Sequence, residues 1–201
     1  MKQTDIAEFV RGLGIEASDA QVSMLLNYEE KLVERGGDLG LISRQDRERV
    51  RDRHILDCVR AAAPSPSVGL AYDLGSGGGL PGVVVAILRP ELKVKLVERR
   101  ALRAAFLEWI ADELPLPNVE VSAGRIEDVP RGLADVCFAR ALASLPESWA
   151  LASGLLKPGG RLIYFAGGQA ELPGSLPDAD SIRVLREKVL ESAGPLAIIT
   201  R

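Results

Sequence analysis

Residues 70–90 read LAYDLGSGGGLPGVVVAILRP, and this stretch decides the fold. An apolar run meets Asp73, a group of glycines follows, and a second apolar run begins at Val83. This order is typical of a buried strand that turns sharply into a helix, and glycines at such a turn let a ligand approach the backbone closely. The stretch therefore predicts a ligand-binding turn in an α/β protein.

Strands and helices are predicted to alternate around and after this turn. Short strands are predicted at residues 68–74, 93–98, 119–124, 134–141 and 161–167, and helices at residues 101–114 and 146–156. Residues 181–190 and 195–200 indicate a closing pair of strands, although the first of these also fits a helix. Such alternation implies a doubly wound, mostly parallel sheet with both faces covered.

A helical region precedes the sheet. Residues 19–35 place apolar side chains on one face, and Ser18 opens a capping box at their start. A second helix is predicted over residues 45–62. We therefore divide the chain into an N-terminal helical extension, residues 1–65, and one compact unit, residues 66–201.

The composition limits the class of protein. The 201 residues are 47% hydrophobic and 26% charged, with a net charge of −3, so the chain can bury a core but is no nucleic-acid binder in bulk. Any RNA contact must come from a local patch, and arginines do cluster over residues 44–53 and 99–103. Two cysteines in apolar contexts, one histidine, no signal-peptide pattern and no apolar run of membrane length lead us to expect a cytoplasmic protein without a metal or a membrane segment.

The glycine turn formally matches the dinucleotide fingerprint at Gly77, Gly79 and Gly82. Two features argue against a dinucleotide. Asp73 would bring its negative charge to a pyrophosphate, and Pro81 removes an N–H donor from the helix start that binds phosphate. The P-loop pattern is absent, which excludes that kind of nucleotide site. A nicotinamide oxidoreductase therefore remains only a disfavoured alternative.

A ligand with a cationic end, an adenosine and no phosphate suits these residues better. S-adenosyl-L-methionine has an ammonium group that suits Asp73, and ribose hydroxyls that suit Glu98 at the end of the second strand. Its adenine suits Ile126 and the acidic Glu127 beyond the third strand, and Gly77 leaves room beside the turn. This order of residues is the one that a class I methyltransferase requires, so we predict that fold and S-adenosyl-L-methionine as the cofactor.

Four stretches carry a resemblance to a known family. RHILDCV, DLGSGGGLPGVVVAILRP, RIEDV and ARALASL together resemble the glucose-inhibited division protein B family, also called the ribosomal small subunit methyltransferase G family. The resemblance runs from about residue 22 to residue 200 and implies S-adenosylmethionine-dependent methylation of N7 of a guanine in 16S rRNA, giving 7-methylguanosine. It also implies cofactor contacts at Gly75, Leu80, Ile126, Glu127 and Arg140.

The chemistry that the resemblance implies needs positioning more than proton transfer. Guanine N7 has a free lone pair and no proton to lose, so no general base is required. We therefore assign no catalytic residue and take Arg140 and His54 as candidate orienting residues. The alternative role of Arg140 is an ion pair with an acid such as Asp73, and Asp57 is spaced to pair with His54 or Arg53.

RNA binding is predicted to rest on local positive charge. The candidate residues are Arg53, Arg100, Arg103 and Arg125. The expected partner is 16S rRNA or the 30S subunit, bound by a monomer, although the lysine usual in the family near Gly167 is missing here. Two alternatives stay open: a small-molecule methyltransferase on the same fold, and a ribosome assembly factor that binds S-adenosylmethionine without turnover.

Overall fold

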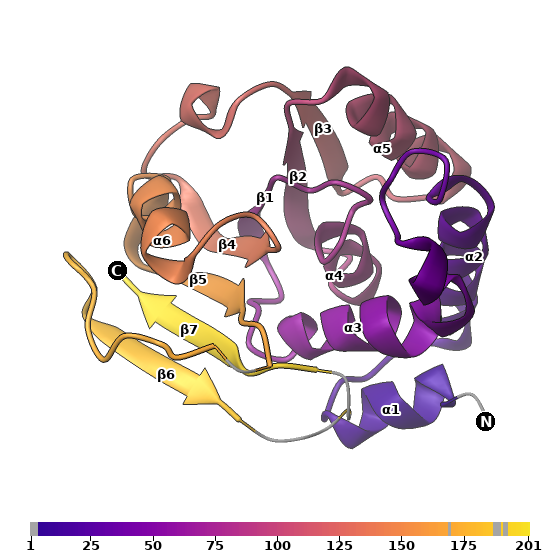
Figure 1. The fold of residues 1–201 in the computed structure, drawn as a ribbon, viewed down its shortest axis with the longest axis horizontal. Helices are drawn as coiled ribbons and strands as arrows, with labels where there is room; N and C mark the ends of the chain where they lie inside the picture. The colour runs from indigo at the N-terminus through magenta and orange to yellow at the C-terminus, as the bar shows by residue number, and fades with distance from the viewer. Residues whose placement is uncertain (1–3, 169, 187–189, 191–192) are drawn as a thin grey trace.

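The computed structural model describes residues 4–168, 170–186, 190 and 193–201. In this part of the chain seven strands form one sheet in the order β3-β2-β1-β4-β5-β7-β6 (Figure 1). The strands are β1 (Gly69–Leu74), β2 (Leu92–Glu98), β3 (Val119–Ala123), β4 (Ala134–Arg140), β5 (Leu156–Phe165), β6 (Ser181–Leu185) and β7 (Leu196–Thr200). Strands β1 to β5 run parallel, whereas β7 is antiparallel to both β5 and β6. The predicted mostly parallel, doubly wound sheet is therefore confirmed.

The helices agree with the sequence in three places. They are α1 (Ile6–Gly12), α2 (Asp19–Arg35), α3 (Leu56–Ala62), α4 (Gly82–Leu88), α5 (Ala101–Glu113) and α6 (Leu145–Ser153). Helix α2 has the predicted capping box between Ser18 and Gln21, and α5 and α6 lie where helices were predicted. The closing strand pair is also present as β6 and β7, but residues 187–189 of its predicted first strand lie outside the described residues.

The prediction of one continuous helix over residues 45–62 is wrong. The chain there forms a 3-10 helix, η1 (Arg44–Arg49), then a π-helical turn, η2 (Arg51–Ile55), and only then α3. Val50 and Ile55, five residues apart, are both buried. A π turn places residues five apart on one face, so it lets both side chains reach the core where an α-helix would turn one of them away.

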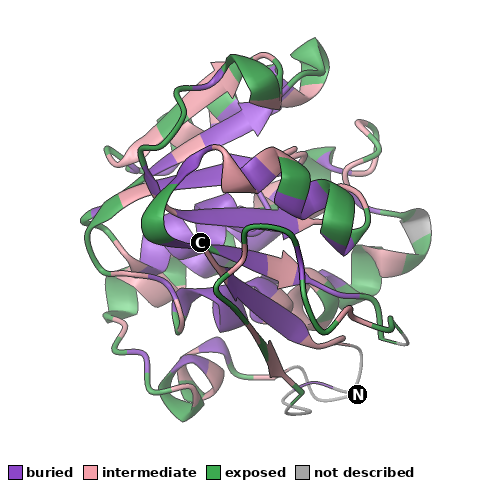
Figure 2. Ribbon diagram, turned by 90° about the vertical axis from the view of Figure 1, so that its left-hand side faces the viewer, coloured by how far each residue is buried: buried purple, intermediate pink, exposed green. Residues whose placement is uncertain are grey.

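The sheet separates two hydrophobic clusters. Along β1, Ala71 belongs to one cluster while Tyr72 and Leu74 belong to the other, as the alternation of a strand requires. Residues of α1 to α5 join the first cluster and residues of α6 join the second. Figure 2 shows the result, with buried strands between layers that are exposed on their outer sides.

The helical extension shares its core with the sheet. The first cluster holds buried residues of α1, α2 and α3 together with α4 and the strands. Helix α4 is buried at every position, because it packs against α2, α3 and β2. The division at residues 65 and 66 remains a prediction. Nowhere in the described part of the chain is there a helix with the length and apolar character needed to cross a bilayer.

Candidate functional site

The carboxyl ends of the parallel strands bring the predicted residues to one edge of the sheet. Leu74 pairs with Val97, so the glycine turn after β1 and Glu98 at the end of β2 lie side by side. Glu98 itself pairs with Ala123 at the end of β3. Ligands collect at this edge in open parallel sheets.

Asp73 connects the two ends of the glycine turn from its buried side. Its Oδ2 accepts a hydrogen bond from Ser76 Oγ at 2.5 Å and another from the Gly82 amide at 3.0 Å. The side chain is buried, and this burial raises the pKa of Asp73 to about 6. The carboxylate therefore joins both ends of the turn and is directed into the protein.

The first amides of α4 are already occupied. Pro81 has no N–H, the Gly82 amide binds Asp73, and the Val83 amide donates to the Gly79 carbonyl at 2.8 Å. A pyrophosphate needs free donors at this position. The sequence argument against a dinucleotide holds for Pro81, but Asp73 acts differently from the prediction, because it occupies a donor instead of facing the ligand.

Glu98 fixes the other side of the turn. Its Oε2 accepts from the Gly77 amide at 2.9 Å, and its Oε1 accepts from the Arg100 amide, also at 2.9 Å. Tyr28 of α2 supports the same turn by donating its hydroxyl to the Gly78 carbonyl at 2.6 Å. The loops after β1 and β2 are thus tied to each other and to the helical extension.

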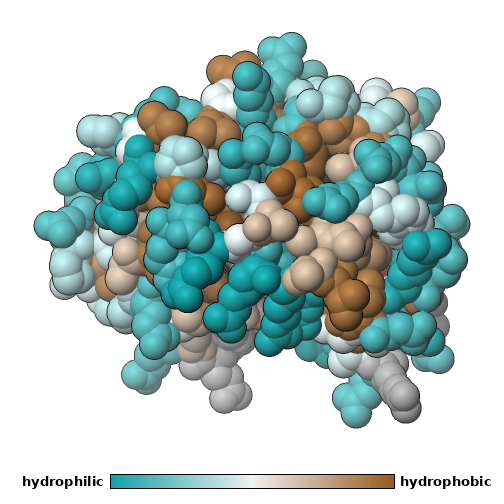
Figure 3. Space-filling view, turned by 90° about the horizontal axis from the view of Figure 1, so that it is seen from above, coloured by the Kyte–Doolittle hydropathy of each residue, from teal (hydrophilic) through white to brown (hydrophobic). Residues whose placement is uncertain are grey.

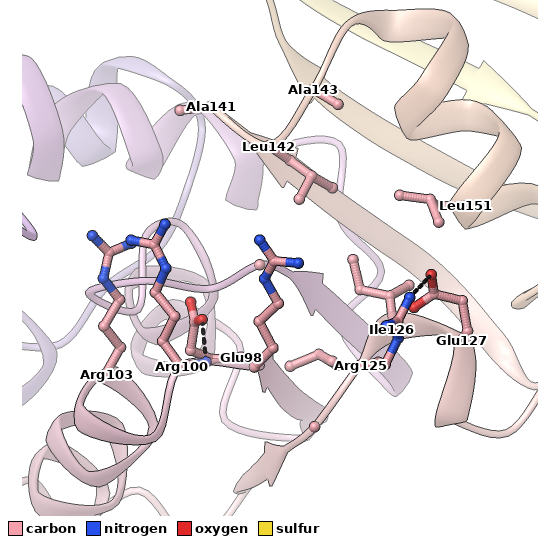
Figure 4. A pocket seen from close by; sticks show the side chains of 14 residues that line it. Glu98, Arg100, Arg103, Arg125, Ile126, Glu127, Ala141, Leu142, Ala143 and Leu151 are labelled. Carbon is pink, nitrogen blue, oxygen red and sulfur yellow. Dashed lines mark hydrogen bonds and ion pairs between the residues drawn. The ribbon is translucent and has the colours of Figure 1, made fainter.

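A cavity of about 360 Å³ opens beside Glu98 (Figure 4). It is large enough for a cofactor-sized ligand. Of the predicted site residues, it is lined by Gly75, Glu98, Arg100, Arg103, Arg125, Ile126 and Glu127. The others lie outside its lining: Arg53, His54, Asp73, Gly77, Leu80 and Arg140.

The sequence analysis missed the apolar wall of this cavity. Ala141, Leu142 and Ala143 from the β4–α6 connection line it, together with Leu151 of α6. Ala141 has a φ of 53°, an uncommon value for a residue other than glycine. Ala141, Leu142 and Ala143 lie within the stretch ARALASL, but no role was predicted for them from the sequence.

A second cluster joins the end of β4 to η2 and α3. The Arg140 guanidinium donates to His54 Nδ1 at 2.8 Å and to the Arg53 carbonyl at 3.1 Å, and its Nε lies 3.5 Å from Asp57 Oδ2. Asp57 also binds Arg60 at 2.7 Å. The alternative role considered for Arg140, an ion pair with an acid, is present, but the acid is Asp57 and not Asp73. The predicted pairing of Asp57 with His54 or the Arg53 side chain is wrong, because Asp57 pairs with Arg60 and Arg140. Arg60 lies three residues further along α3, whereas Arg140 reaches Asp57 from β4.

His54 is held in its neutral form. Burial and the adjacent Arg140 charge lower the pKa of His54 to about 4, although Asp46 at 3.8 Å acts against this shift. Because Nδ1 accepts from Arg140, the ring proton resides on Nε2. His54 therefore has no free lone pair with which to act as a base.

The two cysteines are packing residues. Cys58 and Cys137 are both buried, and burial raises the pKa of each thiol well above its usual range. Buried thiols of this kind are unreactive. Among the described residues, no group of three or more histidine, cysteine, aspartate or glutamate side chains is arranged to hold a metal ion.

Comparison with known proteins gives a family match along most of the chain. Residues 21–180 match the GidB family, described as rRNA small subunit methyltransferase G. The chain is 44% identical over 147 residues to the ribosomal RNA small subunit methyltransferase G of Thermobifida fusca, covering 72% of this chain and 61% of that protein. It is 35% identical over 175 residues to the protein of the same name from Leptothrix cholodnii, covering 85% of this chain and 80% of that protein. The chain thus spans about three fifths of the length of the first of these relatives.

Solved structures support the fold. A crystal structure of TYW2 from M. jannaschii in complex with AdoMet superposes with a TM-score of 0.58 at 16% identity, covering 73% of this chain and 74% of that one. At this identity the likeness concerns the architecture alone, and it agrees with the class I methyltransferase fold predicted from the sequence.

Proposed function

Because this chain belongs to the rRNA small subunit methyltransferase G family, we propose that it is an S-adenosyl-L-methionine-dependent methyltransferase that acts on 16S rRNA. The main structural support for the proposal is the cavity beside Glu98, at the carboxyl ends of the parallel strands. Its glycine turn has its helix-start amides occupied, which suits a cofactor without phosphate. We further propose N7 of a guanine as the methyl acceptor, the 30S subunit as the substrate particle, and a monomer in the cytoplasm as the active form.

The residues around the cavity fit the parts of this cofactor. Glu98 borders the cavity with a carboxylate suited to ribose hydroxyls, and Ile126 offers an apolar surface to adenine. Leu142 and its neighbours give the cavity an apolar wall as well. When bound, S-adenosylmethionine supplies an electrophilic methyl group on its sulfonium sulfur. Asp73 has a positioning role, since it fixes the turn that would hold the methionine end.

The protein's part in the reaction is to bring two partners together. Guanine N7 needs no deprotonation, so binding and orientation supply most of the catalysis. We propose Arg140, at the end of β4, as an orienting residue, because Asp57, His54 and the Arg53 carbonyl fix its guanidinium. His54 acts through Arg140 and does not need to accept a proton from the substrate.

The test is methyl transfer from labelled S-adenosylmethionine to naked 16S rRNA, to 30S subunits and to tRNA as a control. Label in 16S rRNA, recovered as 7-methylguanosine after nuclease digestion and mass spectrometry, is the expected result. The variant Glu98→Gln should weaken binding of S-adenosylhomocysteine about ten-fold through loss of a charged acceptor, with Glu147→Gln on α6 as the matched control. Cofactor binding without label in any RNA would contradict the proposed activity, and binding of NADH in preference to S-adenosylhomocysteine would contradict the cofactor.

A further inference from the structure

Three arginines stand in a row at the mouth of the cavity. Arg99 and Arg100 follow β2 directly, and Arg103 lies in the first turn of α5. Figure 4 shows Arg100 and Arg103 directed to the same side of the cavity. Arg103 donates to the Gly40 carbonyl at 3.0 Å, which fixes its guanidinium at the rim. Among the described residues, neither Arg99 nor Arg100 forms a side-chain ion pair.

The wall of the cavity carries uncompensated positive charge. Four arginines and two glutamates line it. Glu127 pairs with Arg125 at 3.2 Å, and the Glu98 carboxylate is engaged by the main-chain amides of Gly77 and Arg100. S-adenosylmethionine is itself a net cation, so it does not balance the remaining arginines. The positive charge of these arginines instead favours a second, anionic ligand at the mouth of the cavity.

In the other arginine run, three side chains lie beside carboxylates. Arg47 lies 3.8 Å from Asp38, Arg51 lies 2.9 Å from Glu29, and Arg53 lies 2.8 Å from Asp46. These three guanidinium groups form ion pairs that connect η1 and η2 to neighbouring acids within the helical extension. The two runs look alike in the sequence, but their surroundings differ.

We propose that Arg99, Arg100 and Arg103 bind the phosphodiester backbone of the RNA strand that carries the target base. The strand would then cross the cavity mouth on the side of α5, and not on the side of η1 and η2. This inference rests on the proposed function and states where the RNA substrate lies on the protein surface. Guanidinium groups bind phosphate through paired, charge-assisted hydrogen bonds, and each neutralised phosphate contributes to the salt dependence of binding.

The first experiment compares two double variants of the full chain. Arg99→Gln with Arg100→Gln removes two rim charges and leaves Arg103 on Gly40. Arg161→Gln with Arg183→Gln removes two exposed arginines from β5 and β6, toward the other edge of the sheet, and serves as the matched control. Fluorescence anisotropy with a single-stranded 16S rRNA fragment, over a series of KCl concentrations, gives the dissociation constant and its salt slope.

The rim variant should bind the fragment about ten-fold more weakly near 0.15 M salt, with a salt slope smaller by about 1.4, because two phosphate contacts are lost. Its affinity for S-adenosylhomocysteine should stay within about two-fold of the parent, and circular dichroism should show an unchanged fold. The control should bind RNA like the parent. Excess inorganic phosphate or a mononucleotide should displace the fragment only weakly, because single phosphates lack the contiguous backbone.

Three results would overturn the inference. Equal losses of RNA affinity in both double variants would point to bulk charge. A loss of S-adenosylhomocysteine affinity with RNA affinity intact would assign the arginines to the cofactor. Displacement of RNA by inorganic phosphate at comparable concentration would assign the rim to a free anion. Failure of the parent protein to methylate any RNA would instead contradict the proposed function, and so the two failures are distinguishable.

Discussion

At the scale of single residues, the polar side chains of this site mostly hold other protein groups in place. Asp73, Glu98 and Arg140 each make at least two hydrogen bonds or ion pairs within the protein. Buried and satisfied groups of this kind give a rigid frame, since each lost partner leaves an unpaired polar atom. The site is therefore organised before any ligand arrives.

His54 makes the free energy of unfolding depend on pH. Its pKa is lowered from 6.5 to about 4 by burial and by Arg140 of β4 and Arg53, against the opposing charge of Asp46 on η1. The unfolded chain thus binds a proton between these pH values while the folded chain does not. The contribution to the free energy of unfolding is complete above about pH 6.5 and is lost as the pH falls toward 4.

We therefore expect His54→Gln to flatten the acid limb of the stability curve. Relative to the parent, the variant should gain about 2 kcal/mol in free energy of unfolding as the pH falls from about 7.5 to about 5, since it carries no group to protonate. Asp73, whose pKa is raised, is present in both proteins and cancels in the difference. Urea unfolding at the two pH values measures the effect, and a parallel shift of both proteins would show that His54 is not held neutral.

At the scale of the elements, α2 acts as a support for the glycine turn. Tyr28 is fully buried and bonds the Gly78 carbonyl at 2.6 Å. A side chain at Gly78 would lie 3.2 Å from Leu32 of the same helix, so helix and turn are in close contact. The helical extension thereby reaches the side of the molecule where we propose that the cofactor binds.

Tyr28→Phe should consequently affect both stability and binding. The change leaves the Gly78 carbonyl without its partner, which costs about 1–2 kcal/mol of stability. It should also weaken S-adenosylhomocysteine binding several-fold in calorimetric titration, because the turn is less well fixed. Tyr72→Phe is the control: its hydroxyl bonds the Pro130 carbonyl at 3.2 Å, away from the turn, so it should lose stability and keep its affinity. Equal affinities in the two variants would refute the supporting role of α2.

The same scale shows what the sequence can and cannot predict. The strands and α2, α5 and α6 were predicted because alternation, apolar periodicity and capping residues are local signals. The π turn at η2 was not, because the need to bury both Val50 and Ile55 arises from the surface they pack against. The direction of Asp73 depends on the Gly82 amide, and the partner of Arg140 comes from another element, so neither follows from spacing along the chain.

At the scale of the whole molecule, one core connects the helical extension to the sheet. Leu25 of α2 is fully buried in the cluster that also holds α4 and the inner residues of β1, β2 and β4. The second cluster lies across the sheet, around Trp149 of α6. The face seen from above in Figure 3 mixes hydrophilic side chains with hydrophobic patches.

A shared core predicts that the chain unfolds in one cooperative step. Leu25→Ala should lower the free energy of unfolding by about 3 kcal/mol, the usual cost of emptying a buried leucine site. In a Trp109→Phe background, the fluorescence of Trp149 reports the far side of the sheet, where its indole nitrogen donates to the Pro177 carbonyl at 2.7 Å. The urea midpoints from Trp149 fluorescence and from far-ultraviolet circular dichroism should coincide and fall together in the variant, as a two-state transition requires. The opposite result would be a Leu25→Ala variant with a lower circular dichroism midpoint and an unchanged Trp149 midpoint. The helical extension and the sheet would then be separate folding units, and the contact of the extension with the glycine turn would not belong to one cooperative structure.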